Sequence, residues 1–268
     1  ILINDGRIVS VQPYRAGLAD KAKQLDWSAY TVSPGFMDMH THLAGDIQNF
    51  SVEAYLKAKP ENDVLAGVAN ARKTLMAGFT TVRDVGSYNG FVDVSLRDAI
   101  AKGWFPGPRM FTAGAYVTVP GGGGEVSGLL DAARIPARMR EGVAKGEAEV
   151  IAKTDLILDH DVDWIKMIVT GAVLTDGTDV NQSEFGIAEV RAAVRRGGDS
   201  VVQFGEIPRP DRVLPLPDAD PQALGRKHGE VESHRVLRRE HAVKVQVRAR
   251  HHLRRQRGRR VVRRVVIR

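Results

Sequence analysis

The chain has 268 residues, 43% of them hydrophobic, which is enough to bury the core of one large domain or of two smaller ones. It contains no cysteine, so disulfides, thiolate metal sites and cysteine nucleophiles are excluded, and any metal must be held by histidine, carboxylate or a modified side chain. The formal net charge of +7 is unevenly distributed, because residues 1–194 carry 19 Lys and Arg against 24 Asp and Glu, whereas residues 195–268 carry 20 against 8.

The N-terminal residues predict a small β unit. Apolar runs flank Asn4-Asp5-Gly6, and Asp-Gly tolerates the positive φ angles of a tight hairpin turn. A further strand is expected near residues 30–32. Because the chain starts with Ile1 rather than Met, we expect that a preceding segment has been lost, together with any signal peptide it held. The compartment is therefore left open between the cytoplasm and, with such a signal, the periplasm or the exterior.

From Pro34 the pattern alternates between strands and helices. We expect strands at residues 36–42, 80–85, 109–113 and 164–169, and helices at residues 62–77, 92–102, 137–158 and 184–194. Four such β/α units imply a parallel sheet, because each parallel connection needs a crossover helix. On periodicity alone, a doubly wound sheet and half of a (β/α)8 barrel fit equally well.

The alternation ends after Val194. Residues 207–221 contain five prolines, and residues 248–268 contain ten arginines. We interpret residues 195–268 as a frameshifted or disordered segment, since out-of-frame codons of a GC-rich gene yield Arg, Pro, Gly, Ala and Val. The rival interpretation is a genuine basic tail that binds nucleic acid through phosphate charge. Against it, residues 205–268 contain no Phe, Tyr or Trp that would stack on bases.

The strongest chemical signal is the pair His40 and His42. Residues two apart in a strand point to the same face, so two imidazoles at a strand end can bind one metal ion from one side. The alternative is two ordinary polar residues at the end of a strand. Asp38 lies on the same face one pleat earlier, and we expect it to orient an imidazole or to pack deeper rather than to bind the metal itself.

Three other features receive no catalytic role. Arg83 and Asp84 are interpreted as an internal pair or as supports of the sheet, and the glycine run at residues 121–124 as a mobile active-site loop, since no Lys-Ser/Thr follows it to make a phosphate cradle. His160 lies among aspartates just before the fourth strand, where a solvated turn is the expected structure.

Four stretches then show a resemblance to a known family. They are residues 34–43 (PGFMDMHTHL), 78–84 (GFTTVRD), 107–110 (GPRM) and 163–171 (DWIKMIVTG). In this order and spacing they resemble the first four strands of the amidohydrolase superfamily, and most of all its imidazolonepropionase-like subgroup, which includes enzymes similar to Xaa-Pro dipeptidases.

The resemblance implies a small β-sandwich joined to a (β/α)8 TIM barrel. Residues 1–33 would be part of the sandwich, residues 34–194 the first half of the barrel with about four β/α units, and residues 195–268 an irregular basic tail. It implies hydrolysis of an amide, cyclic amide or dipeptide C–N bond by a water that one or two divalent ions activate. Zinc is the expected metal, given histidine and oxygen ligands.

Lys166 is the third expected ligand. Its neighbours Trp164-Ile165 and Met167-Ile168-Val169 are apolar, and a charged lysine is costly to bury there, although a snorkelling surface lysine is the plainer alternative. In the subgroup that the chain resembles, the lysine at this position is carbamylated and bridges two metals. Lys166 is therefore expected to be a carboxylated lysine in the intact protein.

The family pattern also requires a histidine after the fifth strand, one after the sixth, and an aspartate after the eighth that moves the proton. The later histidines match none of these motifs: His228, His234, His241, His251 and His252. The catalytic residue is thus unassigned, and we expect this chain to be incomplete and inactive as it stands. A non-catalytic half-barrel that acts with a partner chain remains the other alternative.

The expected partners follow. They are a small amide or dipeptide substrate and, in the parent protein, further copies of itself. No membrane partner is expected, because no apolar run approaches the roughly 18 residues that a membrane-spanning helix needs.

Overall fold

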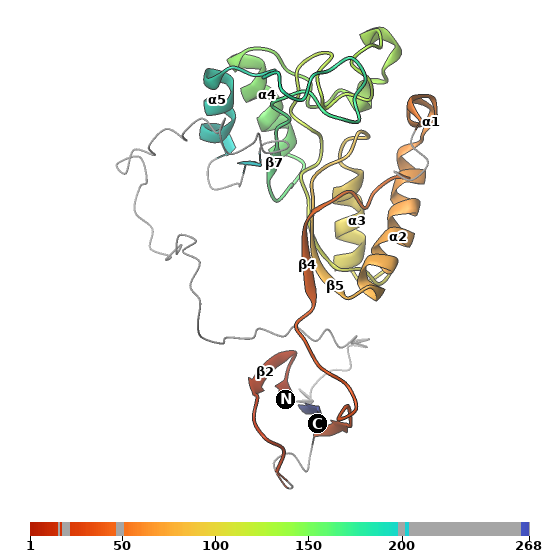
Figure 1. Cartoon of the computed structure of the whole chain (residues 1–268), viewed down its shortest axis with the longest axis vertical. Helices are drawn as coiled ribbons and strands as arrows, with labels where there is room; N and C mark the ends of the chain where they lie inside the picture. The colour runs from red at the N-terminus through yellow and green to blue at the C-terminus, as the bar shows by residue number, and fades with distance from the viewer. Residues whose placement is uncertain (16, 18–21, 47–50, 198–201, 204–263, 268) are drawn as a thin grey trace, which may run out of the picture. The chain divides into compact units, whose positions relative to one another are not determined.

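A computed structural model describes residues 1–15, 17, 22–46, 51–197, 202–203 and 264–267 (Figure 1). They belong to two compact units. One begins at the N-terminus, runs to Gly35 and includes the C-terminal strand, and the other begins at Phe36. No helix in these stretches is long and apolar enough to cross a membrane.

The N-terminal unit contains the predicted hairpin. Strands β1 (Leu2–Asn4) and β2 (Arg7–Ser10) pair in the antiparallel direction. Between them, Asp5 and Gly6 have φ angles of 49° and 74°. Both turn residues are thus left-handed, as a two-residue hairpin turn of this kind requires, and the hairpin is confirmed.

Two further strands complete this sheet, in the order β2-β1-β9-β3. Strand β3 (Lys23–Leu25) is parallel to β9 (Arg264–Ile267), which is antiparallel to β1. Strand β9 thus lies within residues 195–268, for which irregular structure is expected. Residues 204–263, which make up most of the predicted tail, lie outside the described residues.

The strand expected near residues 30–32 does not form. Tyr30 instead closes a turn, in which its N–H donates to the Trp27 carbonyl at 2.8 Å. The side chain of Asp26 stabilises this turn by accepting a hydrogen bond from the Ser28 N–H at 3.0 Å. The local aspartate turn thus overrides the strand preference of the residues that follow it.

The second unit opens with a parallel three-stranded sheet in the order β4-β5-β6. Its strands are β4 (Phe36–Thr41), β5 (Phe79–Asp84) and β6 (Arg109–Phe111), close to the predicted positions. The crossover helices are α2 (Pro60–Met76) and α3 (Val92–Ala101), and a short helix that the pattern did not predict, α1 (Val52–Lys57), precedes α2. Figure 1 shows α2 and α3 side by side, alongside β4 and β5.

Close packing joins α2, α3 and the sheet. Gly67 on α2 lies so near α3 that an added Cβ atom would be 2.7 Å from a methyl group of Leu96. Ala71, one helical turn further on, is fully buried. The core beneath these helices consists of Leu43, Ala44, Ala71, Val82, Val92, Leu96, Ile100 and Met110. Helix α2 ends as expected just before Gly78, which has a φ of +97°.

The remaining part of the second unit continues the β/α alternation. Strand β7 (Ile165–Lys166) pairs in parallel with β8 (Val202–Gln203), and the helices are α4 (Glu147–Leu158) and α5 (Ile187–Gly197). The alternation therefore extends one strand beyond Val194, where the sequence pattern seemed to end. The predicted α/β class with a parallel sheet is confirmed.

The helix expected at residues 137–158 is only half as long. A 3-10 turn forms at Ala137–Met139, and α4 starts only at Glu147. Two glycines explain the difference. Gly146 has a φ of +82°, outside the helical region, and Gly142 lies so close to the Tyr116 carbonyl that no side chain fits there.

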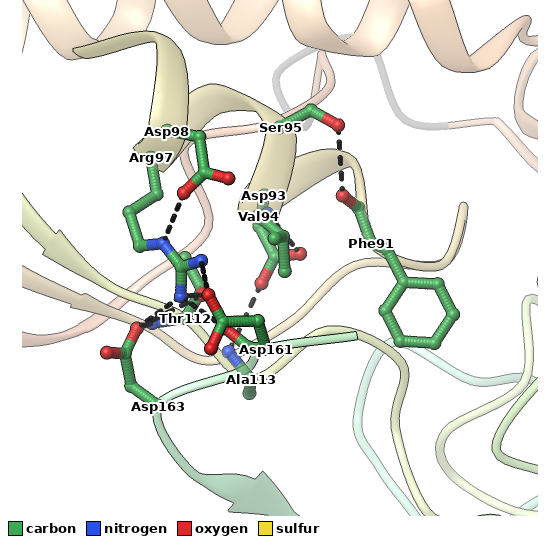
Figure 2. A network of polar contacts seen from close by, with 10 residues as sticks. All are labelled: Phe91, Asp93, Val94, Ser95, Arg97, Asp98, Thr112, Ala113, Asp161 and Asp163. Atoms are coloured by element: carbon green, nitrogen blue, oxygen red, sulfur yellow. Dashed lines mark hydrogen bonds and ion pairs between the residues drawn. The ribbon is translucent and has the colours of Figure 1, made fainter. Parts of the chain in front are cut away.

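A charged cluster on the sheet-facing side of α3 joins it to β6 and to the turn before β7 (Figure 2). We call it the Arg97 clamp and define it as Arg97, Thr112, Asp161 and Asp163. The guanidinium donates to Asp163 Oδ2 at 2.9 Å, to Thr112 Oγ1 at 3.1 Å and to the Asp161 carbonyl at 2.7 Å. Asp163 Oδ2 also accepts from the Thr112 N–H at 2.8 Å, so one carboxylate oxygen connects the clamp to the β6 backbone.

Candidate metal centre

His40 and His42 lie together at the carboxyl end of β4. His40 is exposed within the strand, and His42 follows the strand and is half-buried. Their ring centroids are 5.8 Å apart, with 72° between the ring planes. Asp38 Oδ1 accepts a hydrogen bond from the His40 main-chain N–H at 3.0 Å. Its carboxylate therefore holds the backbone that carries His40.

One hydrogen bond sets the orientation of the His42 ring. Its Nδ1 lies 2.8 Å from the Gly86 carbonyl oxygen. Because a carbonyl oxygen can only accept, the neutral ring that fits this contact carries its proton on Nδ1 and keeps the lone pair on Nε2. Metal-binding histidines are held in the same way, with one ring nitrogen donating to a carbonyl or carboxylate and the other facing the metal.

Lys166 occupies the buried strand β7 between Ile165 and Met167, both fully buried. Its exposure is 4%, so it is not a snorkelling surface lysine. Burial lowers the pKa of His42, and the charges of His40 and Lys166 lower it further, against the opposing effect of the Gly86 hydrogen bond. The three predicted ligands are thus close enough to influence one another electrostatically, and His42 is favoured in the neutral form that binds metals.

The donor set is poor in oxygen. Across the stretches that the structure describes, no group of three or more His, Cys, Asp or Glu side chains is arranged to hold a metal. The described donors are two imidazoles and one lysine nitrogen, which fit a divalent cation better once the lysine carries a carbamate oxygen. The five later histidines, from His228 to His252, lie outside the described residues.

His160 has the structural role that the sequence predicts. Its ring stacks on Phe91, with centroids 3.5 Å apart and planes 2° apart, and Nδ1 lies 2.8 Å from the Leu156 carbonyl. The residue is exposed and belongs to the turn after α4. It therefore offers a matched control for the histidines of the candidate centre.

The glycine run at residues 121–124 is packed rather than open. The Gly123 N–H donates to both carboxylate oxygens of Glu184, at 3.0 and 2.9 Å, and the Gly124 N–H donates to Thr118 Oγ1 at 3.0 Å. An added Cβ on Gly123 would lie 2.7 Å from the Thr170 carbonyl. These contacts do not fit the interpretation as a mobile active-site loop, and they leave no free phosphate cradle.

Asp84 is the residue that sequence reasoning undervalued. It does not pair with Arg83, because neighbours in a strand point to opposite faces. The Arg83 guanidinium lies over the Trp164 ring, 4.7 Å from its centroid, and donates to the Met39 carbonyl at 2.7 Å. Asp84 is fully buried on the other face, where it accepts from the Leu43 N–H at 2.7 Å. Strand alternation alone would have separated the two.

The chain is similar to a protein family and to several solved structures. The model of the amidohydrolase family matches residues 31–201. Among solved structures, a Xaa-Pro dipeptidase with bound methionine is 32% identical, with a TM-score of 0.54 over 64% of this chain and 42% of that one. An amidohydrolase is 27% identical, with a TM-score of 0.63 over 75% of this chain and 50% of that one.

A prolidase complexed with N-methylphosphonate-L-proline is 25% identical, with a TM-score of 0.52 over 61% of this chain and 40% of that one. No curated protein sequence gives a significant match. The chain thus spans half or less of the length of these three structures. With the family model covering well over half of its residues, the chain belongs to the amidohydrolase family, whose enzymes are hydrolases that act on carbon–nitrogen bonds.

Proposed function

We propose that this chain supplies part of the metal centre of a hydrolase that cleaves the C–N bond of a dipeptide or a related small amide. The observation that carries the proposal is the His42 ring. Its Nδ1 is occupied by the Gly86 carbonyl, His40 lies beside it, and the charge of buried Lys166 acts on it. Such a convergence of imidazoles and a buried lysine is costly in a protein that does not use it.

His40 and His42 would hold a divalent cation, zinc by preference, through imidazole nitrogens. Lys166 would contribute an oxygen after carbamylation, which replaces a buried cation by an anion and removes its repulsion from the bound metal. When bound, one ion or two would supply the Lewis acidity that polarises an amide carbonyl and acidifies a water molecule. Asp38 would keep the His40 main chain in place through its 3.0 Å hydrogen bond.

The substrate class rests on the similar structures. One is a Xaa-Pro dipeptidase with methionine in its active site, and another is a prolidase bound to a phosphonate analogue that contains proline. A dipeptide with a C-terminal proline is therefore the first substrate to test. We infer that this chain alone does not hydrolyse it, since the residues that the structure describes supply neither a carboxylate ligand nor a proton-moving aspartate beside the three donors.

Metal titration of the full 268-residue chain tests the proposal. We expect zinc binding by isothermal titration that is lost in His40→Ala and His42→Ala but kept in His160→Ala, whose ring stacks on Phe91 away from the centre. Equal binding by the His40→Ala, His42→Ala double variant would contradict it. After incubation with ¹³C-bicarbonate, a carbamate signal in the ¹³C NMR spectrum is expected for the unsubstituted chain and not for Lys166→Met.

One observation favours a second candidate, a half-barrel that acts with a partner chain. In the described part of the protein, β4 is an edge strand, and Met37 and Met39 on one of its faces are 69% and 46% exposed. Open strand edges with apolar side chains tend to associate. Sedimentation analysis is expected to show association that Met37→Lys weakens, and a monomer at every concentration would exclude this candidate.

A further inference from the structure

The Gly86 carbonyl accepts two hydrogen bonds. One comes from His42 Nδ1 at 2.8 Å and the other from the Tyr116 hydroxyl at 3.0 Å. The hydroxyl oxygen also lies 3.3 Å from His42 Nδ1. If the hydroxyl donated to Nδ1 instead, the nitrogen lone pair would face the carbonyl oxygen at 2.8 Å. The imidazole, the hydroxyl and the carbonyl are all satisfied when both His42 Nδ1 and the Tyr116 hydroxyl donate to the Gly86 carbonyl, because its oxygen has two lone pairs.

A buried carboxylate fixes the backbone on both sides of the His42–Gly86 hydrogen bond. Asp84 Oδ2 accepts from the N–H of Leu43, the residue after His42, at 2.7 Å. Asp84 Oδ1 accepts from the N–H of Gly86 itself at 3.1 Å. Asp84 thus connects the segment that carries the imidazole to the segment that carries its acceptor.

Only glycine fits at position 86. Its φ angle is +103°, a conformation that other residues rarely adopt. An added Cβ would lie 2.8 Å from both the Gly114 carbonyl oxygen and the Tyr116 ring. The backbone can therefore approach Tyr116 closely enough for the hydroxyl to reach the Gly86 carbonyl.

Ring packing holds the Tyr116 hydroxyl in place. The Tyr116 ring meets the His42 ring edge-on, with centroids 6.1 Å apart, and the Tyr88 ring edge-on at 5.5 Å. Edge-to-face pairs of this kind are favourable and directional. The ring is thus fixed between its neighbours, and its hydroxyl has little freedom to turn away from Gly86.

We propose that Asp84, Gly86 and Tyr116 form a positioning unit, here called the Asp84 brace, that holds His42 in the Nδ1–H tautomer and so presents Nε2 to a divalent cation. The contacts of all three lead to His42 or to the backbone beside it, so they act through His42. This inference depends on the proposed function only in naming a divalent cation as the group that Nε2 binds. The tautomer itself is a property of the metal-free chain and can be measured without the metal.

The test is long-range ¹H–¹⁵N NMR of histidine-labelled, metal-free full-length chain, with the His42 signals assigned by their loss in His42→Ala. We expect an Nδ1–H imidazole at His42 in the unsubstituted chain and a mixture of tautomers in Tyr116→Phe and in Asp84→Asn. Tyr88→Phe is the matched control, because its hydroxyl bonds to Thr175 rather than to Gly86. Tyr116→Phe removes one oxygen only, so it remains informative if Asp84→Asn does not fold.

Zinc titration of the same proteins gives the second readout. Groups that orient a metal-binding histidine typically contribute 10–100-fold to metal affinity, so Tyr116→Phe is expected to weaken zinc binding by about tenfold, and Tyr88→Phe to leave it unchanged. An Nε2–H imidazole in the unsubstituted chain, or a pure Nδ1–H signal retained in Tyr116→Phe, would overturn the proposal. If the unsubstituted chain binds no zinc, the proposed function fails, while the tautomer measurement still decides on the brace.

Discussion

In the Arg97 clamp, a guanidinium donates hydrogen bonds to carboxylates. In the Asp84 brace, by contrast, the carboxylate accepts hydrogen bonds from the backbone N–H groups of Leu43 and Gly86. The clamp is partly open to solvent, since the side chain of Asp163 is 32% exposed. Asp84 is fully buried. Burial lowers the pKa of Arg97, but its hydrogen bonds to Asp163 and Asp98 outweigh this effect, so the pKa is raised. At Asp84, burial itself raises the pKa of the carboxyl group.

This difference suggests different tasks. Partly exposed ion pairs are weakened by salt, so the clamp suits a mechanical role in joining α3 to the turn before β7. Hydrogen bonds from buried backbone groups depend strongly on geometry and little on salt, so the brace suits the orientation of a functional side chain.

The largest effect is expected at Asp93, a buried carboxylate held in the same way as Asp84. It accepts from the N–H group of Ala113 at 3.2 Å (Figure 2) and from that of Gly114 at 2.8 Å, both beyond the end of β6. Asp93→Ala leaves these buried donors without a partner, so the free energy of unfolding should fall by about 3 kcal/mol. Urea unfolding measures it, and Ser95→Ala, an exposed change on the same helix, should cost less than about 0.5 kcal/mol. Equal losses in the two variants would contradict the prediction.

A smaller effect is expected in the clamp. Arg97→Met keeps the aliphatic stem but removes every guanidinium hydrogen bond, and the free energy of unfolding should fall by about 1–2 kcal/mol. The difference between the variant and the unsubstituted chain should shrink in about 1 M salt, where the Debye length is about 3 Å. Lys57→Met breaks the exposed pair with Glu53 and serves as the control, with an expected loss of about 0.3–0.5 kcal/mol. A loss at Arg97 that salt leaves unchanged would show that the clamp does not act through charge.

The pH dependence of stability tests the buried carboxylates Asp84 and Asp93. Burial raises the pKa of Asp84, the charge of Asp93 raises it more, and burial raises the pKa of Asp93 as well. Above about pH 4 the folded chain keeps protons that the unfolded chain has lost, so the contribution of this pair to stability falls as the pH rises through the raised values. Asp84→Asn should flatten this part of the profile in urea unfolding between about pH 4 and pH 8. A fall in the free energy of unfolding with rising pH that is steeper in Asp84→Asn than in the unsubstituted chain would contradict this prediction.

Much of the fold follows from local patterns. Positive φ at Asp5 and Gly6 follows from residue chemistry, and the alternation from β4 to α5 follows from hydrophobic periodicity. The pairing of β9 with β1 was not predictable in this way, because it joins residues from opposite ends of the chain. The start of α4 depends on how closely Gly142 approaches a distant carbonyl, which periodicity does not contain.

The candidate centre divides along the same line. The proximity of His40 and His42 follows from their spacing on one strand, and the roles of Lys166 and Asp38 remain predictions. The brace could not be predicted from the sequence, because the group that accepts from both His42 and Tyr116 is the backbone carbonyl of Gly86. A carbonyl has no residue type to recognise, and Tyr116 reaches it from a segment thirty positions away.

The smallest effect is expected on the other face of β5. Arg83 is the neighbour of Asp84, but it lies over Trp164 and donates to the Met39 carbonyl, away from His42. Arg83→Met should lower the free energy of unfolding by about 1 kcal/mol, from the loss of a cation–π contact and one hydrogen bond, and should leave the His42 tautomer unchanged. Asp84→Asn, one residue along the strand, should change the tautomer. If Arg83→Met also altered the His42 tautomer, the brace would not be separate from the general rigidity of β5, and the contrast between the two faces would fail.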